Sequence, residues 1–223
     1  MAEKIKRAWM VRAGNDNVLA GEVEERGAIA IGWKDMGNMA TLQTRAQFKS
    51  RFQEAYPGES PGRIPNKAGQ VFRFAREIEQ GDCIVTYDKS TRELIVGIVE
   101  SPYFYDPMLF DADYPNVRRV RWIKRISRDS FTPNARNSLG SILTVFNLDD
   151  HLDEINALTA GKKEPESVKE QAAETPPFYE DVKAKADEFI ADLVSKLDPY
   201  QFQDLVAALL RAMGFRAVSS AGT

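Results

Sequence analysis

A charged stretch near the end of the chain limits what the sequence can fold into, because it cannot be part of a core. Residues 161–177 are rich in Lys, Glu and Pro and nearly free of large apolar side chains. Such a segment cannot bury enough apolar surface to offset its conformational entropy. We therefore predict an acidic flexible linker over residues 151–177, which separates a first domain of residues 1–150 from a last segment of residues 178–223.

The charges of the chain are unevenly distributed. Residues 1–150 hold 22 Lys and Arg against 20 Asp and Glu, whereas residues 151–223 hold 8 against 13. The formal net charge of −3 argues against a protein that coats nucleic acid indiscriminately. Residues 118–128 nevertheless contain six cations and no acid, and we call them the basic stripe. Its cations are Arg118, Arg119, Arg121, Lys124, Arg125 and Arg128.

The sequence offers little for disulfide, zinc or membrane chemistry. One cysteine, Cys83, and one histidine, His151, exclude an internal disulfide framework and a His/Cys zinc cluster. No apolar run approaches the roughly 18 residues that a membrane helix needs, and no apolar stretch follows the charged start. We therefore expect neither a membrane protein nor a secreted one, and we expect the cytoplasm as its location.

The first 150 residues alternate short β-prone runs with two helical patterns. Apolar positions over residues 44–56 and 68–78 are spaced as in amphipathic helices. Turn residues between the two central β-prone runs indicate a hairpin. The β-prone runs lie at residues 8–12, 27–33, 83–87, 94–99, 117–126 and 141–146. This order predicts an α+β fold with a small, mostly antiparallel curled sheet or barrel and inserted helices.

The last segment contains a strongly amphipathic helical pattern. Phe202, Leu205, Val206, Leu209, Leu210 and Met213 share one face, after Asp198-Pro199 and before Gly214. A second helical pattern covers residues 178–197. The stretch from Leu197 to Phe215 resembles the opening of the catalytic domain in Mrr-type restriction endonucleases, where such a helix leads into a strand and then the active site.

This resemblance implies a nuclease of the PD-(D/E)XK type, in which acidic residues hold Mg²⁺ and a lysine orients the attacking water. Those residues would follow Thr223, so we assign no catalytic residue and no metal ligand, and we expect this chain to bind DNA without cutting it. We expect no cofactor in this chain and Mg²⁺ in an intact nuclease. Many relatives have Glu where this chain has Gln203, and Gln203 and Asp204 are consistent with solvent-facing helix positions.

Several short pieces of the first domain, spread over residues 8–147, resemble the EVE and PUA-like superfamily. That resemblance implies a small barrel-like domain with a pocket for a nucleobase, commonly a modified one, of the kind that precedes modification-dependent nucleases. The pieces are Trp9-Met-Val-Arg-Ala, Ala30-Ile-Gly-Trp33, Phe72-Arg-Phe-Ala, Gly81-Asp-Cys-Ile-Val-Thr, and Val96-Gly-Ile-Val followed by Tyr103-Phe-Tyr105.

Reading a flipped base requires flat side chains for stacking and a polar group for the base edge. We predict a base pocket in which Trp33 is the best candidate, because it follows Ile31-Gly32 and ends a strand. Most aromatic residues of a β-rich domain are nevertheless core residues. The predicted pocket residues are Trp33, Phe74, Ser101, Tyr103, Tyr105 and Trp122, and Asp35, Asn38 and Asp106 are further polar candidates.

The cations of the first domain are candidates for contact with phosphate groups. In a strand, alternate residues face opposite sides, so the basic stripe cannot present all its cations on one face. An edge strand protected by cations would have the same pattern. The predicted phosphate-binding residues are Arg73, Arg76, Arg118, Arg119, Arg121, Lys124 and Arg125.

We therefore expect a partner that is double-stranded DNA with a modified base. Two other hypotheses remain open. An RNA-binding PUA-like module would recognise the 2′-hydroxyl and ignore DNA modification. A regulatory protein would use its last two helices for dimerisation, and residues 178–214 would form a homodimer because their apolar faces need a cover.

Overall fold

The computed structural model describes residues 4–161, 190, 194 and 197–214. It divides into two compact units, and every strand of the described residues lies in the first. The described helix of the second unit is α7 (Pro199–Ala212). The first unit is α+β with a curled, mostly antiparallel sheet, which confirms the predicted fold class.

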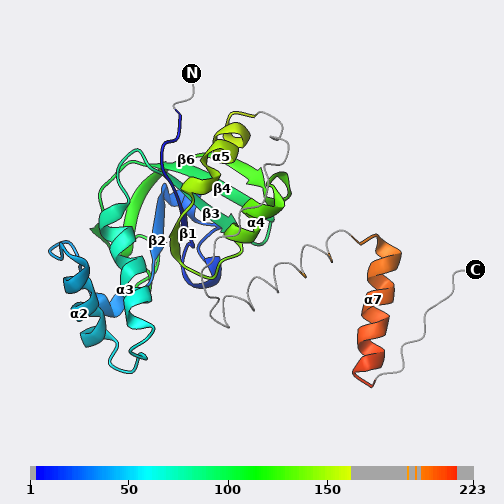
Figure 1. Ribbon diagram of the computed structural model, residues 1–223, viewed down its shortest axis with the longest axis horizontal. Coiled ribbons are helices and arrows are strands. Elements are labelled where there is room, and N and C mark those ends of the chain that lie inside the picture. The colour runs from blue at the N-terminus through cyan, green and yellow to red at the C-terminus, as the bar shows by residue number, and fades with distance from the viewer. Residues whose placement is uncertain (1–3, 162–189, 191–193, 195–196, 215–223) are drawn as a thin grey trace, which may run out of the picture. The chain divides into compact units, whose positions relative to one another are not determined.

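The sheet has the strand order β2-β6-β4-β3-β1-β7, with β5 paired to β6 beside this path. β1 and β3 are parallel, and the other pairs are antiparallel (Figure 1). The predicted hairpin is β3 and β4. The strands are β1 (Ala8–Val11), β2 (Ala28–Ile31), β3 (Cys83–Asp88), β4 (Glu93–Val99), β5 (Phe104–Tyr105), β6 (Asn116–Ser127) and β7 (Val145–Asn147).

Helices cover both faces of this sheet. α2 and α3 lie on one side of the strands, and α4 and α5 lie on the other (Figure 1). The α-helices of the first unit are α1 (Val23–Arg26), α2 (Arg45–Ala55), α3 (Ile64–Phe72), α4 (Pro133–Leu139) and α5 (Leu152–Thr159). Short 3-10 turns are η1 (Asn15–Asn17), η2 (Lys34–Met36), η4 (Arg128–Ser130) and η5 (Asp149–His151), and η3 (Arg73–Glu77) is a π-helical turn.

The alternation of side chains along the strands explains this two-sided arrangement. Trp9 and Ile84 belong to a core with the buried residues of α2 and α3. Their neighbours Met10 and Val85 belong to a second core with α4 and α5. Successive residues of a strand point to opposite faces, so strands that are apolar at every position need a cover on both.

The two helices inserted between β2 and β3 differ in how well the sequence locates them. α2 begins after Thr44, whose hydroxyl accepts a hydrogen bond from the Gln47 amide in a capping box. α3 begins at Ile64, four residues before the predicted start, and ends at Phe72. The chain then continues as η3, where the Ile78 amide donates to the Arg73 carbonyl. This i→i+5 bond is the wider turn of a π-helix.

The predicted start of the linker at residue 151 is wrong, because α5 is part of the first unit. Ile155 and Leu158 are buried in the second core. The side chain of Asn156 accepts from the Ile5 amide at 2.9 Å and donates to the Ile5 carbonyl at 3.0 Å. These contacts bind the helix to the start of the chain.

The described part of the last segment agrees with its predicted helix. The Asp198 carboxylate caps α7 by accepting from the amides of Tyr200 and Gln201, and Gly214 follows it with a φ of 90°. The linker after residue 161, most of the helix predicted over residues 178–197 and the strand that the Mrr-type resemblance implies after the last helix lie outside the described residues. No helix of the described part has the length and apolar character needed to cross a membrane.

The carboxylate of Asp88 connects the β3–β4 hairpin to β6. It accepts from the Ser90 amide at 3.0 Å, from the Ser90 hydroxyl at 2.6 Å and from Arg125 Nη1 at 3.0 Å. Burial raises the pKa of Asp88, but these hydrogen bonds lower it more, so its pKa lies below the ordinary value of 3.8.

We expect Asp88→Asn to destabilise the protein at neutral pH but not in acid. Because the folded-state pKa is lowered, the carboxylate stabilises the fold fully above its ordinary pKa, and this contribution is lost as the pH falls through the folded-state pKa. At neutral pH the loss should be about 1–3 kcal/mol in the free energy of unfolding by urea. Asp150→Asn, which removes an exposed carboxylate, is the control. If the free energy of unfolding of Asp88→Asn stays below that of the wild type in strong acid, the electrostatic explanation is contradicted.

Candidate nucleic-acid interface

Three loops meet around Tyr114. The Tyr114 hydroxyl accepts a hydrogen bond from the Asn15 amide at 3.3 Å, which connects the loop after β1. The backbone of Gly32, after β2, lies so close that an added Cβ would be 3.8 Å from the Tyr114 ring. Lys34 and Asp113 form an exposed ion pair at 2.5 Å between the loop after β2 and the loop before β6. We call residues 12–19, 32–39 and 106–115 the three-loop site.

Trp33 has an unusual backbone conformation in this site. Its φ is 58° and its ψ is 45°, in the left-handed region, which costs a residue with a Cβ roughly 1–2 kcal/mol. The side chain is half-buried. Strained backbone of this kind persists where the surroundings impose it, and such positions gather at ligand sites.

A buried hydrogen-bond network imposes the conformation of the Trp33 loop. Asn116 Nδ2 donates to the Gly32 carbonyl at 2.5 Å, and the Tyr103 hydroxyl donates to Asn116 Oδ1 at 2.9 Å. The same hydroxyl accepts from the Met39 amide at 3.2 Å. Burial raises the pKa of Tyr103 to about 12, so the hydroxyl keeps its proton at neutral pH. Two predicted pocket residues, Trp33 and Tyr103, are therefore connected through Asn116.

Asn17 is a member of the three-loop site that the sequence analysis did not identify. Its φ is 61°, and its side chain is only 6% exposed. Within the described residues, neither Oδ1 nor Nδ2 of Asn17 has a hydrogen-bond partner, and the same holds for the hydroxyl of Thr86 on β3. A buried amide without a partner is costly, so Asn17 is a candidate for contact with a ligand. The only sequence signal is the short Asn-Asp-Asn run after Gly14.

Two of the predicted pocket aromatics have structural roles. Phe74 is fully buried in the core with α2 and α3, so its predicted role in a base pocket is wrong. Trp122 is half-buried, and its Nε1 donates to the Val23 carbonyl at 2.7 Å, which attaches α1 to β6. Phe74 therefore offers no free face for stacking, whereas Trp122 is held at its Nε1 by the Val23 carbonyl and stays partly exposed.

The other two predicted pocket residues lie on or beside β5. The Ser101 hydroxyl donates to the Pro102 carbonyl and accepts from the Arg119 amide, both at 2.8 Å. Tyr105 is half-buried and packs on the same core as Trp33. Neither residue belongs to the network around Trp33 and Tyr103 that the described part of the chain contains.

Most cations of the basic stripe are held by other residues of the first unit. Lys124 Nζ donates to the Leu158 carbonyl at 2.5 Å, where α5 ends. Arg125 contacts three carboxylates, those of Glu24, Asp88 and Glu93. The bulge opposite Val96 and Gly97 also changes which β6 residues face each side. These contacts compete with phosphate for Lys124 and Arg125, so their phosphate contact stays a prediction.

The remaining predicted cations differ in exposure. Arg119 is exposed and lies 5.5 Å from the centre of the Phe104 ring. Arg121 is also exposed and forms an ion pair with Glu100 at 2.9 Å. Arg73 is half-buried, with Glu77 at 3.9 Å. Exposed ion pairs are weak, so Arg121 stays available for phosphate contact. Arg119 donates to the Arg26 carbonyl at 3.1 Å and is likewise exposed.

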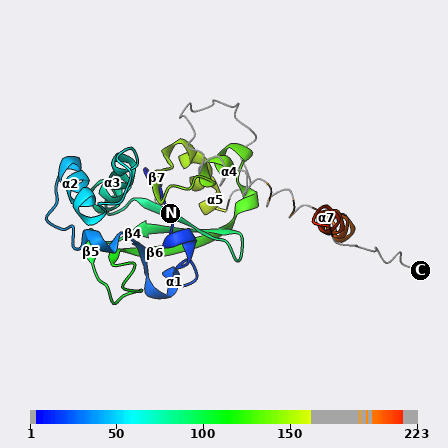
Figure 2. The same ribbon diagram turned by 90° about the horizontal axis from the view of Figure 1, so that it is seen from below.

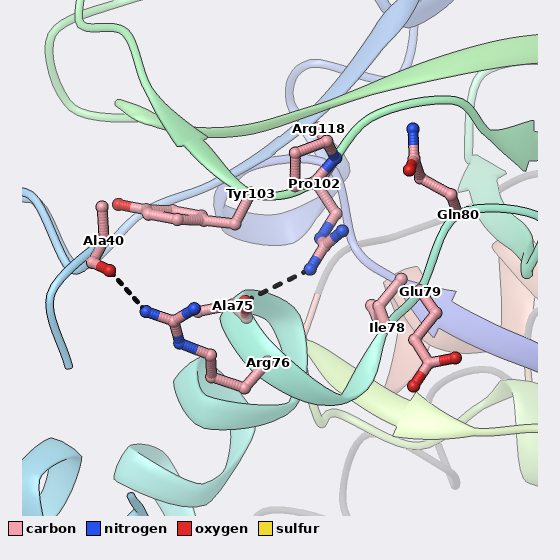
Figure 3. A pocket seen from close by; sticks show the side chains of 9 residues that line it. All are labelled: Ala40, Ala75, Arg76, Ile78, Glu79, Gln80, Pro102, Tyr103 and Arg118. Atoms are coloured by element: carbon pink, nitrogen blue, oxygen red, sulfur yellow. Dashed lines mark hydrogen bonds between the residues drawn. The ribbon is translucent and has the colours of Figure 1, made fainter. Parts of the chain in front are cut away.

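Arg118 and Arg76 meet at a cavity of about 520 Å³ beside η3. Arg118 is 2% exposed and donates to the carbonyls of Phe74 and Ser101 at 2.7 and 3.0 Å, so it can contact a phosphate only inside this cavity and not on the outer surface beside Arg119. Burial lowers the pKa of Arg118 to about 10, which leaves it charged at neutral pH. Figure 3 shows both guanidinium groups beside the Tyr103 ring. The cavity is lined by Ala40, Ala75, Arg76, Ile78, Glu79, Gln80, Pro102, Tyr103 and Arg118.

Across residues 4–161 and 197–214, no three His, Cys, Asp or Glu side chains are grouped so that they could hold a metal ion. The cavity beside η3 and the three-loop site combine cations, amides and aromatic rings with single carboxylates such as Glu79 and Asp113. These groups bind through hydrogen bonds, stacking and attraction to anions.

A family model described as "Domain of unknown function (DUF8426)" matches residues 9–149. No curated protein matches the chain. A solved structure described as "Crystal structure of the MmI1 YTH domain" is similar at 13% identity and a TM-score of 0.27, over 84% of this chain and 98% of that one. Another, "YTH domain-containing protein mmi1 and RNA complex", has 11% identity and a TM-score of 0.27, over 96% of this chain and 89% of that one.

Proposed function

The chain belongs to the family described as "Domain of unknown function (DUF8426)", and we propose that its first unit is a nucleic-acid-binding domain that reads a modified base in double-stranded DNA. The three-loop site would receive the base after it is turned out of the duplex. Enzymes and readers that inspect a single base extrude it in this way, because the base edge is otherwise paired.

The buried amide of Asn17 is the observation that carries this proposal. An asparagine side chain presents one acceptor and two donors, which match the polar edge of a nucleobase. The partnerless state of both groups in the described residues means that a ligand could satisfy them without breaking an existing bond. A bidentate contact between an amide and a base gives about 1–3 kcal/mol of discrimination.

Trp33 supplies the second requirement, a flat surface for stacking. Its loop is fixed before any ligand arrives, since Asn116 and Tyr103 hold the backbone on either side. A preformed site loses less conformational entropy on binding than a mobile loop. Stacking of a base on an aromatic ring contributes about 1–3 kcal/mol.

The exposed cations Arg119 and Arg121 would supply contacts to the DNA backbone. Such contacts attract any duplex, because every duplex carries the same phosphates. Base selection would then depend on Asn17 and Trp33. The two arginines would then set how tightly the domain binds any duplex, whereas Asn17 and Trp33 would set which base it prefers.

For the second unit we propose the start of an Mrr-type nuclease domain, with Mg²⁺ as its metal in an intact enzyme. The support is the resemblance over residues 197–215 and the apolar face of α7. Phe202, Leu209 and Met213 are 48%, 55% and 71% exposed. An apolar face of this extent needs a cover, either the rest of such a domain or a second copy of residues 178–214.

The experiment that tests base reading compares matched duplexes under one salt concentration. The duplexes carry cytosine, 5-methylcytosine, 5-hydroxymethylcytosine or N6-methyladenine at one position, and an RNA of the same sequence is included. We expect one modified duplex to bind more tightly than its unmodified counterpart. Equal affinities across the DNA series would refute the proposal, and a preference for the RNA would assign the site to RNA.

We expect Asn17→Gly to abolish that preference without destabilising the fold. Glycine accepts the positive φ of this position, and removal of a partnerless amide costs little, so the free energy of unfolding should change by less than about 1 kcal/mol. The difference in binding free energy between the modified and the unmodified duplex should fall by about 1–3 kcal/mol. Asn15→Gly, which changes an exposed side chain of the same loop, is the control. A stable Asn17→Gly protein with an unchanged preference would place base reading elsewhere.

A further inference from the structure

The cavity beside η3 is separate from the three-loop site, although Tyr103 contacts both, and its charge is unusual. Arg76 and Arg118 both line it. In the described part of the chain, neither guanidinium forms an ion pair with a carboxylate, and their hydrogen bonds go to backbone carbonyls. A buried cation without a counter-charge is costly. Arg118 is buried, and the half-buried Arg76 lies beside it at the same cavity.

The nearest acids offset the charge of this pair only in part. Asp82 raises the pKa of Arg118 through its charge and so offsets part of it, while its carboxylate accepts from Trp9 Nε1 at 2.9 Å and from the Glu79 amide at 3.0 Å rather than from Arg118. Glu79 lines the cavity, yet Figure 3 shows its carboxylate pointing away from both arginines. The space between Arg76, Arg118 and Tyr103 is therefore positively charged.

Both arginines also keep unused donors. Arg118 uses Nε and one N–H on each terminal nitrogen, for Phe74, Ser101 and Ala75. Arg76 uses Nε for Leu42 and Nη2 for Ala40 and Met39. Among the described residues, nothing accepts from Nη1 of Arg76 or from the second N–H of each terminal nitrogen of Arg118. Figure 3 shows one terminal nitrogen of Arg76 turned toward the space below Tyr103.

The π-helical turn positions this arrangement. Because η3 is wider than an α-helical turn, Phe74 and Ala75 present carbonyls sideways to Arg118 at 2.7 and 3.3 Å. The next residue, Arg76, can then reach the carbonyls of Ala40 and Leu42 across the loop, each at 2.6 Å. Single π-helical turns inside α-helices are frequent at functional sites.

We infer that this cavity binds the phosphate group of a nucleotide. Guanidinium donors fixed in place suit the oxygens of phosphate, and charge-assisted bonds of this kind are about twice as strong as neutral ones. A cavity of about 520 Å³ is of the size that holds small molecules rather than a bare ion. The nucleotide is either free or the phosphorylated end of a strand.

The test measures binding of adenosine 5′-monophosphate and adenosine to the full chain by calorimetry at fixed ionic strength. We expect the monophosphate to bind at least about tenfold more tightly. Ala40→Glu places a carboxylate at the cavity without removing an arginine, because the Ala40 side chain is exposed. It should weaken monophosphate binding about tenfold. Ala46→Glu, an equal change of charge on exposed α2, should not.

Two short nucleic-acid strands of one sequence, with and without a 5′-phosphate, distinguish a free nucleotide from the phosphorylated end of a strand. A gain from the 5′-phosphate that Ala40→Glu removes assigns the cavity to strand ends, whereas a gain for the free monophosphate alone assigns it to free nucleotides. Equal binding of adenosine and its monophosphate, or equal affinity in the two Glu variants, overturns the inference. Trp33→Ala should leave monophosphate binding unchanged, because Trp33 does not line the cavity. The inference therefore fails or holds independently of base reading.

Discussion

Gly97→Ala should destabilise the first unit by about 3 kcal/mol or more, since it forces an atom into occupied space. A Cβ at Gly97 would lie 2.5 Å from Val120 Cγ1, 2.7 Å from Trp122 Cε3 and 3.0 Å from the Arg121 carbonyl oxygen. The carbonyl belongs to the backbone of β6 and cannot rotate away. Gly97 lies at the bulge where β4 pairs with β6, so any adjustment would disturb the central strands.

The matched control for Gly97→Ala is Gly69→Ala in α3. No heavy atom lies within 4 Å of a Cβ added at Gly69, and alanine stabilises a helix by roughly 0.5–1 kcal/mol relative to glycine. The same substitution should therefore have opposite signs at the two positions. Urea denaturation of both variants measures the difference, and a Gly97→Ala protein as stable as wild type would show that β6 does not approach β4 so closely.

Sequence patterns were sufficient to predict those helices and strands whose bounds depend on residues close together in the chain. Thr44 and Gln47 form a capping box at the start of α2, and Pro57-Gly58 follows its end. The strands β3 and β4 have apolar residues at nearly every position, and they lie where the sequence analysis expected a hairpin. In each case the decisive residues lie within a few positions of one another.

The errors concern features that depend on distant partners. The sequence shows that Arg125 is a cation, but its carboxylates come from Glu24, Asp88 and Glu93, on three separate segments. The π-helical turn at η3 holds Arg118, which lies more than forty residues later in the sequence. No periodicity could reveal either arrangement, because propensity and pattern describe only neighbours along the chain.

Asn17 shows the same limit within the candidate site. A surface loop with Asn-Asp-Asn is an ordinary turn by composition. Its amide becomes notable only when the fold buries it without a partner. Trp33 was identifiable from the sequence because it ends a β-prone run after a glycine, although its left-handed backbone was not. Functional groups that violate local rules are those that sequence patterns describe least well.

Trp33→Ala should remove the preference for a modified base and leave weak binding that depends on salt. Loss of one stacking surface costs about 1–3 kcal/mol, which is the part of the affinity that distinguishes one duplex from another. The attraction of exposed Arg119 and Arg121 to phosphates would remain, so the slope of affinity against salt concentration should not change. Fluorescence titrations of modified and unmodified duplexes at several salt concentrations measure both quantities.

Two further variants separate this loss from general damage. Phe146→Ala removes a half-buried aromatic ring from the opposite face of the sheet, so it should destabilise the fold similarly and keep the preference. Replacement of Arg121 by Ala should weaken all duplexes alike and flatten the salt dependence, because a phosphate contact carries no base information. A folded Trp33→Ala protein that keeps its full preference would exclude Trp33 as the stacking residue. The half-buried Tyr105, which packs on the same core, would then be the next residue to replace.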